Sequence, residues 1–577
     1  MTETRRRAGG TRRLDGVPLA IELAAARTGV LSPEQILSRL DDRFALLTGG
    51  GRTAPSRHCT LLATMDWSHD LLSGKKKILY RRLSVFSGGF TLGAAEAVCC
   101  SGEVGEEEVL ELLSHLLDKS LVAAEERAES GVRRYRLLET IRQYAIRRLE
   151  ESGEAETLRR GHALFFLPFA EESEPGINGP ERRQFLGRLE AEHDNLRAAL
   201  GEITGGDAGL RLAGALWWFW FHRGYRDEGL GWLGTALGRA EPASTPARAK
   251  ALCGAGWLSF VQGDHEAGRS DLEKGVTVAR EAGDDVSLAY ALGFLAVLRA
   301  HQGDPAPALA EEGVRLFRTT DERWGLGISL TNAGISAEAA GDYALANPYF
   351  EESATIFRDL GDDWALSLPL RHLGIVASRQ QDYARAEGLY KESLALCRDF
   401  GEWWLISLCL EELAGVARWQ GDYPRAAAVG RGGDPAPKDR GRPALPVPRR
   451  LRPRRVATAR AGMGERAFAA AWEKGTALTP EEAVAYALGE EPKPDETTLP
   501  AGLTVREAEV LRLVAAGLTN PQAAERLYLS PPTVNAHPRT IYGELGVNSR
   551  AAATRFAAGY DLLQRKVAQS SGRAPHA

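Results

Sequence analysis

Apolar residues recur at helical spacing along much of the chain, and a short turn signal interrupts them at regular intervals. Gly-Asp, or Gln-Asp in one case, stands at residues 263–264, 303–304, 341–342, 381–382 and 421–422. A second turn lies between these, at residues 283–285, 321–322, 361–363 and 401–402. The period is about 40 residues, so we expect one helix on each side of each turn, repeated along the chain.

Small residues recur in this region where neighbouring helices must approach closely, as in Ala333-Gly334 and Leu373-Gly374. One helix pair cannot bury its apolar face alone, so we expect the pairs to stack into a superhelix. Three turns continue as Asp-Tyr-x-x-Ala, beginning at Asp342, Asp382 and Asp422. This pattern resembles the tetratricopeptide (TPR) family over roughly residues 245–430. The resemblance implies a concave face that takes a protein or a small ligand.

Tryptophans are unusually frequent in and next to the repeats. Because aromatic side chains mostly serve packing, we favour gap filling between helices over lining a ligand-binding face, and both interpretations stay open. These residues are Trp217, Trp218, Trp220, Trp324, Trp364, Trp403 and Trp404. Single histidines in the helical patterns (His193, His222 and His301) are interpreted as surface or packed residues rather than ligands.

A break rich in Pro and Arg follows the repeats at residues 430–460. Proline removes helix hydrogen bonds, so this stretch is expected to be a loop. Three interpretations of this stretch stay open: it is an unstructured linker, its arginines add non-specific contacts to DNA phosphates, or it results from a local frame error in the gene. Helical patterns return at residues 465–472 and 479–488, where Thr479-Pro480 is typical of a helix start.

A compact helical unit is predicted over residues 495–566. Thr504 and Glu507 form a capping box for its first helix, Gly517 ends that helix, and Ser530 caps a third helix with Pro531 at its first position. Two helices joined by a tight turn, the second polar and exposed, have the geometry that enters a DNA major groove. Basic residues outnumber acidic ones here, although the whole chain carries a net charge of −5.

Residues 503–557 closely resemble the LuxR-type helix-turn-helix domain. The resemblance implies that the third helix reads DNA with Asn535, Ala536 and Arg539, and that the fourth helix forms a dimer contact from Arg550 on. Asparagine and arginine pair with base edges, whereas hydroxyl groups and His⁺ suit phosphates. The full predicted DNA-binding set is Thr519, Asn520, Thr533, Asn535, Ala536, His537, Arg539, Tyr542 and Arg550.

The unit departs from the LuxR pattern inside its recognition helix. Pro538 removes a backbone donor and clashes with the preceding turn, which costs ~3 kcal/mol or more. Glu544 places a negative charge where the family commonly has Lys or Arg. Both changes predict weakened DNA affinity.

The first part of the chain resembles a different family. Residues 12–27 include Gly16-Val17-Pro18 and resemble the end of the nucleotide-binding module of STAND switch ATPases, in which this proline lies against adenine. Residues 60–90 and 113–139 resemble the winged-helix part of the same switch. We therefore expect a nucleotide-module remnant at 1–50 and a winged-helix-like domain at 51–155.

The chain has no GxxxxGK[ST] loop and hence no phosphate cradle of that kind. We expect no ATP hydrolysis by this polypeptide alone and no catalytic residues. Gly16 and Pro18 are then a relic, or half of a site that a separate upstream chain completes. We expect no cofactor, unless an upstream nucleotide-binding core supplies ATP or ADP. The six cysteines form no CxxC pair, so no metal site is expected.

The predicted fold is mostly α, with a winged-helix segment, a TPR-like α-solenoid and a C-terminal four-helix helix-turn-helix domain. A helical connector is assigned to 156–205, the repeats to 206–430, a linker with short helices to 431–494, the helix-turn-helix to 495–566 and a disordered tail to 567–577. No apolar run is long enough for a bilayer, so we expect a cytoplasmic protein without a membrane partner.

The functional prediction is a non-enzymatic transcription regulator that binds double-stranded DNA as a homodimer. Its TPR array would sense a protein or small-molecule effector that the sequence does not identify. Two alternatives stay open: a TPR interaction scaffold whose DNA-binding domain has decayed, and a subunit of a split STAND switch ATPase.

Overall fold

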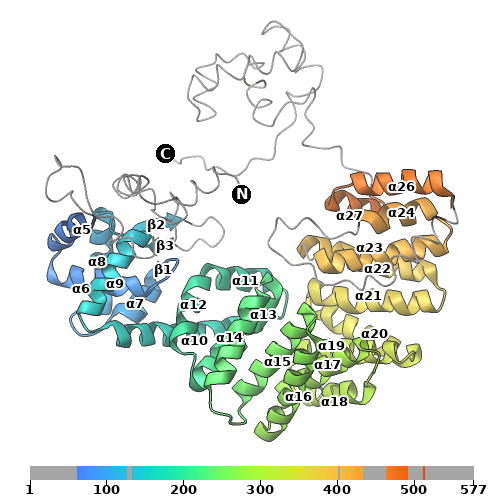
Figure 1. Ribbon diagram of the computed structural model, residues 1–577, viewed down its shortest axis with the longest axis horizontal. Helices are drawn as coiled ribbons and strands as arrows, with labels where there is room; N and C mark the ends of the chain where they lie inside the picture. The colour runs from blue at the N-terminus through green and yellow to red at the C-terminus, as the bar shows by residue number, and fades with distance from the viewer. Residues whose placement is uncertain are drawn as a thin grey trace, which may run out of the picture. The chain divides into compact units, whose positions relative to one another are not determined.

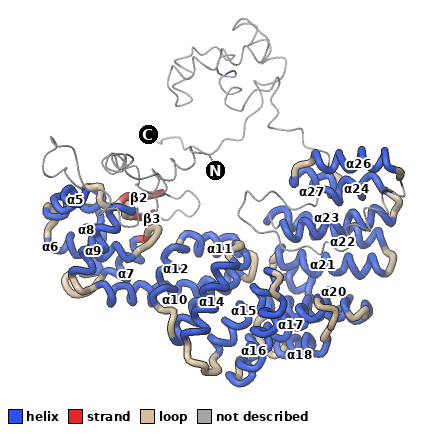
Figure 2. The backbone as a smooth tube through the Cα atoms, in the orientation of Figure 1, coloured by secondary structure: helices blue, strands red, loops and turns tan. Residues whose placement is uncertain are grey.

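A computed structural model describes residues 61–126, 133–400, 403–432, 460, 463–490, 511 and 513. These ranges are almost entirely helical, with one small sheet, so the predicted mostly-α fold is confirmed in them (Figures 1 and 2). The chain forms two compact units, Met1–Pro480 and Glu481–Ala577. The predicted nucleotide-module remnant and most of the predicted helix-turn-helix domain lie outside the described residues.

The first described elements form the predicted winged-helix domain. Its three-stranded antiparallel sheet has the order β1-β3-β2, and Tyr135 of β3 pairs with Phe90 on one side and Ala124 on the other. The strands are β1 (Phe90–Thr91), β2 (Ala123–Glu126) and β3 (Arg133–Arg136). The helices are α5 (Leu61–Asp70), α6 (Gly74–Arg82), the short 3-10 helix η3 (Leu83–Val85), α7 (Leu92–Cys99), α8 (Glu106–Asp118) and α9 (Glu139–Glu151).

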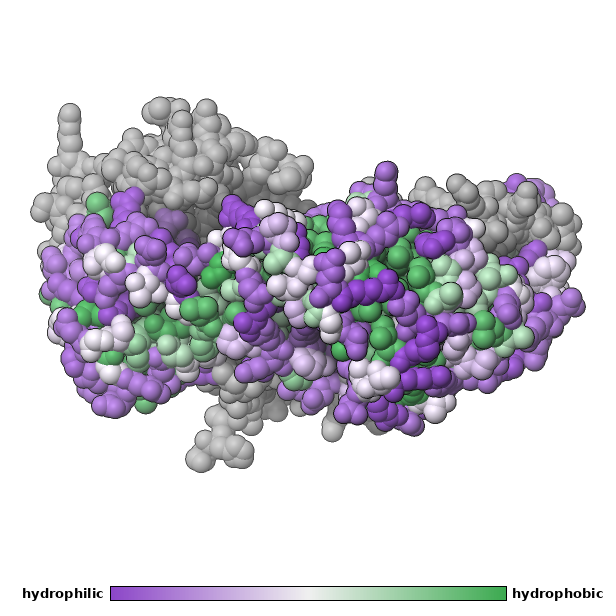
Figure 3. All heavy atoms as spheres, turned by 90° about the horizontal axis from the view of Figure 1, so that it is seen from below, coloured by the Kyte–Doolittle hydropathy of each residue, from purple (hydrophilic) through white to green (hydrophobic). Residues whose placement is uncertain are grey.

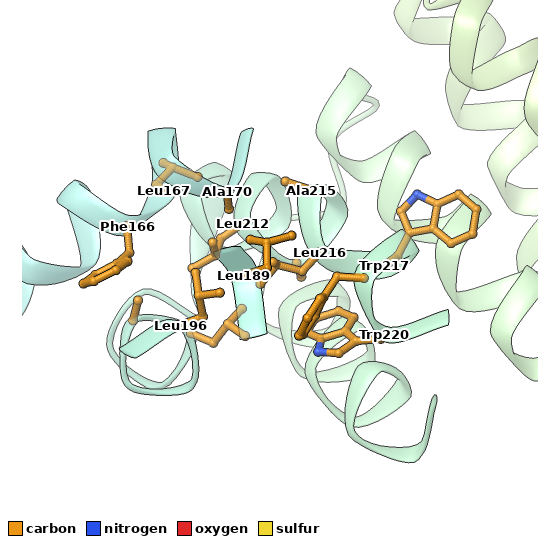
Figure 4. Close-up of a cluster of buried hydrophobic side chains, with 14 of the residues drawn as sticks. Phe166, Leu167, Ala170, Leu189, Leu196, Leu212, Ala215, Leu216, Trp217 and Trp220 are labelled. Carbon is orange, nitrogen blue, oxygen red and sulfur yellow. The ribbon is translucent and has the colours of Figure 1, made fainter. Parts of the chain in front are cut away.

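Three helices connect this domain to the repeats, α10 (Ala155–Ile177), α11 (Arg182–Ala191) and α12 (His193–Glu202), and they pack with α13 (Gly206–Arg223), the first helix of the repeat region. They share one apolar core. Figure 4 shows Phe166, Leu167 and Ala170 of α10 beside Leu189 of α11 and Leu212 of α13. The rings of Trp217 and Trp220 extend the same core along α13, and both side chains are buried.

The repeats form a solenoid in which each helix packs against the next one along the chain (Figures 1 and 2). Its helices are α14 (Arg226–Arg239), α15 (Pro246–Gln262), α16 (His265–Ala282), α17 (Asp285–His301), α18 (Pro307–Phe317), α19 (Arg323–Ala339), α20 (Tyr343–Leu360), α21 (Asp363–Arg379), α22 (Tyr383–Phe400), α23 (Trp403–Trp419) and α24 (Tyr423–Gly432). The predicted helix on each side of each turn is therefore confirmed where the turns are described.

Two further helices follow the Pro/Arg-rich stretch, close to the predicted positions: α26 (Glu465–Ala477) and α27 (Pro480–Leu488). Helix α26 packs against α24, and its Gly475 has the backbone of Ala428 so close that an added β-carbon would lie 2.5 Å from the Ala428 carbonyl oxygen. The packing of α26 on α24 thus extends the solenoid into the segment, residues 431–494, that the sequence assigned to a linker with short helices.

The Gly-Asp turns work as paired helix caps. Gly263 ends α15 with φ of +92°, a left-handed conformation that glycine adopts without strain. The next residue, Asp264, begins α16, and its carboxylate accepts a hydrogen bond from the backbone N–H of Ala267 at 3.0 Å. The Asp264 N–H in turn donates to the Ser259 carbonyl. Corresponding side-chain caps are made by Asp284, Glu322, Asp342, Asp362, Asp382 and Asp422.

Glycines allow the two helices of a repeat to touch, as the sequence predicts. A β-carbon on Gly374 of α21 would lie 2.6 Å from Cε1 of Tyr390 on α22. Gly334 of α19 faces Phe350 of α20 in the same way. The large ring of one helix therefore occupies the space that a side chain on the other would need.

The described surface is largely polar on the face that Figure 3 presents, with smaller groups of hydrophobic residues between hydrophilic ones. None of the helices in the described ranges combines the length and apolar character needed to cross a membrane.

Candidate functional site

The solenoid contains a partly open cavity of about 320 Å³. Nearly all of its wall comes from α13, α15, α17, α19, α21 and α23, the first helix of each successive pair. On each helix the lining residues are adjacent or three to four positions apart, so each helix presents one face. The lining residues are Trp218, Phe221, Trp257, Phe260, Val261, His265, Phe294, Val297, His301, Ile328, Thr331, Asn332, Ile335, Trp364, Leu368, Arg371, His372, Trp404, Leu405 and Leu408.

Aromatic rings form much of this wall. Trp257 stacks on Phe294 with ring centroids 4.4 Å apart, and Phe260 meets the edge of His301 at 5.6 Å. Trp364 lies edge-on to Phe221 at 6.4 Å. These contacts fix the rings against one another, so the aromatic surface is shaped before any ligand arrives.

Polar groups are few, and they gather on α19 and α21. Asn332 is only 6% exposed, and its side-chain amide has no hydrogen-bond partner among the described residues. The guanidinium of Arg371 donates from Nη1 to Nε2 of His372 at 3.1 Å. Because that ring nitrogen accepts, the other one, Nδ1, carries the proton and donates to Glu338 at 2.8 Å.

His372 is therefore held as a neutral ring in a fixed orientation. Burial lowers its pKa below the usual range, although Glu338 opposes that shift. The ring also stacks on Phe350 with centroids 5.1 Å apart. The described residues that line the cavity include no Asp or Glu, and no described carboxylate lies within ion-pair distance of Arg371.

A buried ion pair lies directly behind the wall. Arg182, the first residue of α11, donates to both carboxylate oxygens of Asp362, at 2.7 and 2.6 Å. Asp362 also accepts from the indole N–H of Trp324 at 2.9 Å. The guanidinium of Arg182 lies 4.5 Å from the centroid of the Trp364 ring, which lines the cavity. The connector helices thus contact the cavity wall.

The same connector contacts the winged-helix domain through Asn195 of α12. Its side-chain oxygen accepts from the backbone N–H of Ser87, and its nitrogen donates to the Gly89 carbonyl at 2.8 Å and to Glu192. Glu192 also forms a buried ion pair with Arg134 of β3. The segment that the sequence assigned to a connector therefore carries a buried polar junction.

The predicted DNA-binding residues (Thr519, Asn520, Thr533, Asn535, Ala536, His537, Arg539, Tyr542 and Arg550) lie outside the described residues, as do Gly16 and Pro18. Their roles stay predictions. Within the described ranges no three His, Cys, Asp or Glu side chains are grouped so that they could hold a metal ion.

The tryptophans divide between the two interpretations left open by the sequence. Trp217, Trp220 and Trp324 are buried and lie outside the cavity wall, as packing residues do. Trp218, Trp364 and Trp404 line the cavity, although Trp218 and Trp364 are each only 3% exposed. Trp218 and Trp364 therefore pack between helices and also form part of the cavity wall.

The single histidines also differ in their surroundings. His193 is packed against Phe219 and pairs with Glu228 at 3.0 Å. His222 is buried against Trp218, as a packed residue was expected to be. His301 lines the cavity, which the sequence did not predict.

Sequence reasoning missed Trp257, Asn332 and Arg371. One signal was present: Asn332 interrupts the apolar face of α19, where a polar side chain must find a partner or line a cavity.

Profiles of three protein families match the chain. Residues 501–557 match the bacterial regulatory proteins of the luxR family. The chain carries a LuxR-type helix-turn-helix domain. Residues 72–150 match a winged helix-turn-helix domain, and residues 326–399 match the tetratricopeptide repeat. The resemblances to the LuxR-type domain, the winged helix and the tetratricopeptide repeat are thereby confirmed, and the one at residues 12–27 stays a prediction.

Curated relatives come from mycobacteria and from Escherichia coli. A protein of Mycobacterium tuberculosis, named provisionally as an HTH-type transcriptional regulator, is 39% identical over 345 residues, which is 57% of this chain and 38% of the relative. An uncharacterised protein of the same species is 51% identical over 149 residues, covering 26% of this chain and 37% of its own. The E. coli Fimbriae Z protein is 41% identical over 61 residues, which is 11% of this chain and 29% of that protein. The chain spans under two fifths of the length of these relatives.

Among solved structures, the chain is similar to a STAND protein with a tetratricopeptide repeat sensor from Pyrococcus horikoshii. The two sequences are 13% identical, the TM-score is 0.39, and the aligned region covers 72% of this chain and 68% of the Pyrococcus chain.

Proposed function

We propose that this protein is a DNA-binding transcription regulator. The observation that carries the proposal is the match of residues 501–557 to the luxR family of regulatory proteins. The name of the 39% identical mycobacterial relative, an HTH-type transcriptional regulator, supports it. In this proposal double-stranded DNA is the partner, the protein binds it as a homodimer in the cytoplasm, and the chain itself is no enzyme.

The repeat array is the sensing part of the proposed regulator. A cavity of about 320 Å³ lies at the small end of the roughly 300–1,000 Å³ that small-molecule sites occupy. It is lined by fixed aromatic rings and a few polar groups, the usual composition of such sites. This favours a small-molecule effector over a protein segment.

Two contacts of the connector would couple occupancy of the cavity to the winged-helix domain. Arg182 contacts Trp364 in the cavity wall, and Asn195 holds Ser87 and Gly89. Both contacts lie on α11 and α12, which pack against each other. This chain of contacts supports a mechanism in which a ligand in the cavity affects the winged-helix domain of the same polypeptide.

Selection of DNA fragments by the full-length protein, followed by fluorescence anisotropy on the enriched sequence, tests the function. We expect binding that is sequence-selective and that weakens steeply with salt, because phosphate contacts release counterions. Arg539→Ala should reduce the preference for the selected sequence, since arginine at a base-facing position discriminates bases. Arg318→Ala is a matched control, because Arg318 is 52% exposed on the solenoid and pairs with Glu352.

DNA binding without any sequence preference would refute the proposal that the protein is a transcription regulator. It would favour the alternative of a TPR scaffold with a decayed DNA-binding domain. ATP turnover after mixing with an upstream nucleotide-binding chain would instead favour the split switch ATPase.

Pro538→Leu tests the departure in the predicted recognition helix. Leucine restores a backbone donor and removes the ring clash, so we expect tighter DNA binding than in the natural sequence. The measurement is the dissociation constant for the selected DNA at fixed salt. Equal affinity would show that Pro538 is accommodated without loss.

A further inference from the structure

We propose that the solenoid cavity binds a small planar aromatic carboxylate. The rings of Trp257, Phe294 and Trp364 would take the aromatic part of the ligand, and Arg371 would take its carboxylate. The proposal names the ligand class of the sensing array, and so it rests on the proposed function for its biological role. Ligand binding itself requires no DNA.

The shape of the wall favours a flat ligand. Trp257 and Phe294 stack at 4.4 Å with an interplanar angle of 27°, so each ring covers one face of the other and fixes the orientation of the part that lines the cavity. Trp364 is held in place by Arg182 on one side and by the edge of His222 at 4.7 Å. Rings that are already fixed lose little conformational freedom when a ligand binds, which favours stacking of a planar group.

The charge of the wall favours an anion. Arg371 is the only lining residue that carries a permanent charge, and the described residues place no carboxylate within ion-pair distance of it. Its Nη1 donates to the neutral His372 ring, and its Nε is buried, so the terminal nitrogens carry the donors that a ligand could reach. A guanidinium that pairs directly with no described carboxylate, and that reaches Glu338 only through the His372 ring, keeps donors for the carboxylate of a ligand.

The second polar group of the cavity is Asn332. Asn332 is only 6% exposed as a residue, and its amide lines the cavity without a hydrogen bond to the described residues, so its donors and acceptor face a ligand. It lies opposite Gly293, where a β-carbon would come within 2.9 Å of its Nδ2. An oxygen or nitrogen atom of the ligand would satisfy the amide. A cation has no carboxylate to meet among the described lining residues.

Titration of the full-length protein, without DNA, tests the proposal. The probes are benzoate, naphthalene-2-carboxylate and indole-3-carboxylate, followed by calorimetry and by quenching of tryptophan fluorescence. Each carboxylate that binds is compared with its neutral carboxamide, and cyclohexanecarboxylate serves as the non-aromatic anion. We expect at least one aromatic carboxylate to bind about tenfold or more tightly than its carboxamide and than cyclohexanecarboxylate.

Arg371→Met should weaken binding of that carboxylate about tenfold or more and leave the carboxamide unaffected. Arg379→Met is the matched control, because Arg379 lies on the same helix and is exposed. Arg371→Lys keeps the charge and should retain part of the affinity. Thermal midpoints of the variants show whether the fold is intact.

Failure of all three carboxylates to bind, or equal binding of acid and amide by the natural protein, overturns the proposal without any variant. An Arg371→Met variant that binds like the natural sequence does the same. DNA binding is measured in a separate experiment. A protein that binds the carboxylate but no DNA would refute the proposed function alone, and one that binds DNA but no carboxylate would refute the ligand class alone.

Discussion

Arg182 and Asp362 are 180 positions apart in the chain, yet their side chains form a two-pronged contact of 2.7 and 2.6 Å. The guanidinium side chain is 3% exposed and the carboxylate 1%. Taking both charges out of water is unfavourable, and their attraction together with the Trp324 and Ala365 hydrogen bonds offsets this. The pair is therefore sensitive to the loss of either partner.

Asp362→Asn should lower the free energy of unfolding by about 3 kcal/mol, because it leaves the buried guanidinium without a counter-charge. Asparagine keeps the size of the side chain and its ability to cap α21. Urea unfolding followed by circular dichroism measures the change. The double variant Arg182→Met with Asp362→Asn should recover part of the loss.

Glu352→Gln is the control for this prediction. Its partner Arg318 is 52% exposed, and exposed pairs contribute roughly 0–1 kcal/mol. A loss for Asp362→Asn no larger than that for Glu352→Gln would contradict the prediction.

His162 gives the protein a pH dependence of known sign. Burial lowers the pKa of His162 to about 4, although its hydrogen bond with Asn195 opposes that shift. The unfolded chain keeps the ordinary pKa of about 6.5, so between these values the unfolded state binds more protons. The contribution of His162 to the free energy of unfolding is therefore complete above pH 6.5 and is lost as the pH falls toward 4. The loss from this group amounts to roughly 3 kcal/mol at most.

The test is urea unfolding at several pH values for the natural protein and for His162→Gln. Glutamine retains a polar contact to Asn195 but does not titrate, so the variant should lose less stability between pH 6.5 and pH 4. Parallel curves for the two proteins would mean that other groups cause the acid sensitivity.

At the scale of elements, the helix ends were predictable because they depend on adjacent residues. Gly263 and Asp264 terminate α15 and begin α16 through bonds within four or five positions of themselves. The same is true of Asp342 and Asp422. Local capping chemistry repeats in each turn, so a sequence pattern is enough to place it.

The cavity was not predictable in the same way. Asn332 and Arg371 belong to no motif and come together only when α19 and α21 stack. Trp218 and Trp364 are both packing residues and wall residues, so their type alone does not separate the two roles. Arg182 and Asp362 meet across 180 positions, and no local pattern marks such a pair.

Close contact between paired helices predicts opposite effects of one substitution at two glycines. Gly374→Ala places a methyl group 2.6 Å from the Tyr390 ring, so it should destabilise the protein by about 1–3 kcal/mol through overpacking. Gly388→Ala, on the exposed face of α22 with nothing within 4 Å, should stabilise it by roughly 0.5–1 kcal/mol. Thermal unfolding of both variants measures the signs. Stabilisation by Gly374→Ala would show that Tyr390 moves aside freely.

At the scale of the whole molecule, the chain separates into Met1–Pro480 and Glu481–Ala577. The cavity and the buried ion pair lie in the first unit, and the LuxR-type domain lies in the second. A protein that ends at residue 490 should therefore keep the thermal midpoint of the first unit and lose DNA binding. Calorimetry and anisotropy on the truncated and full-length proteins give the comparison. Retained sequence-selective DNA binding would place the DNA contact elsewhere.

The Arg182–Asp362 contact also determines how the solenoid responds to mechanical force. Repeat arrays usually lose one repeat at a time from a free end, because each repeat touches only its neighbours. Pulling on the C-terminal side of the described solenoid would detach α26, α24, α23 and α22 in this stepwise manner. At α21 the contact with α11 closes residues 182–362 into a loop, and the repeats inside it must give way together. Under force, the C-terminal helices would therefore unfold first and one at a time, and the segment closed by the Arg182–Asp362 ion pair would resist until it unfolds as a unit.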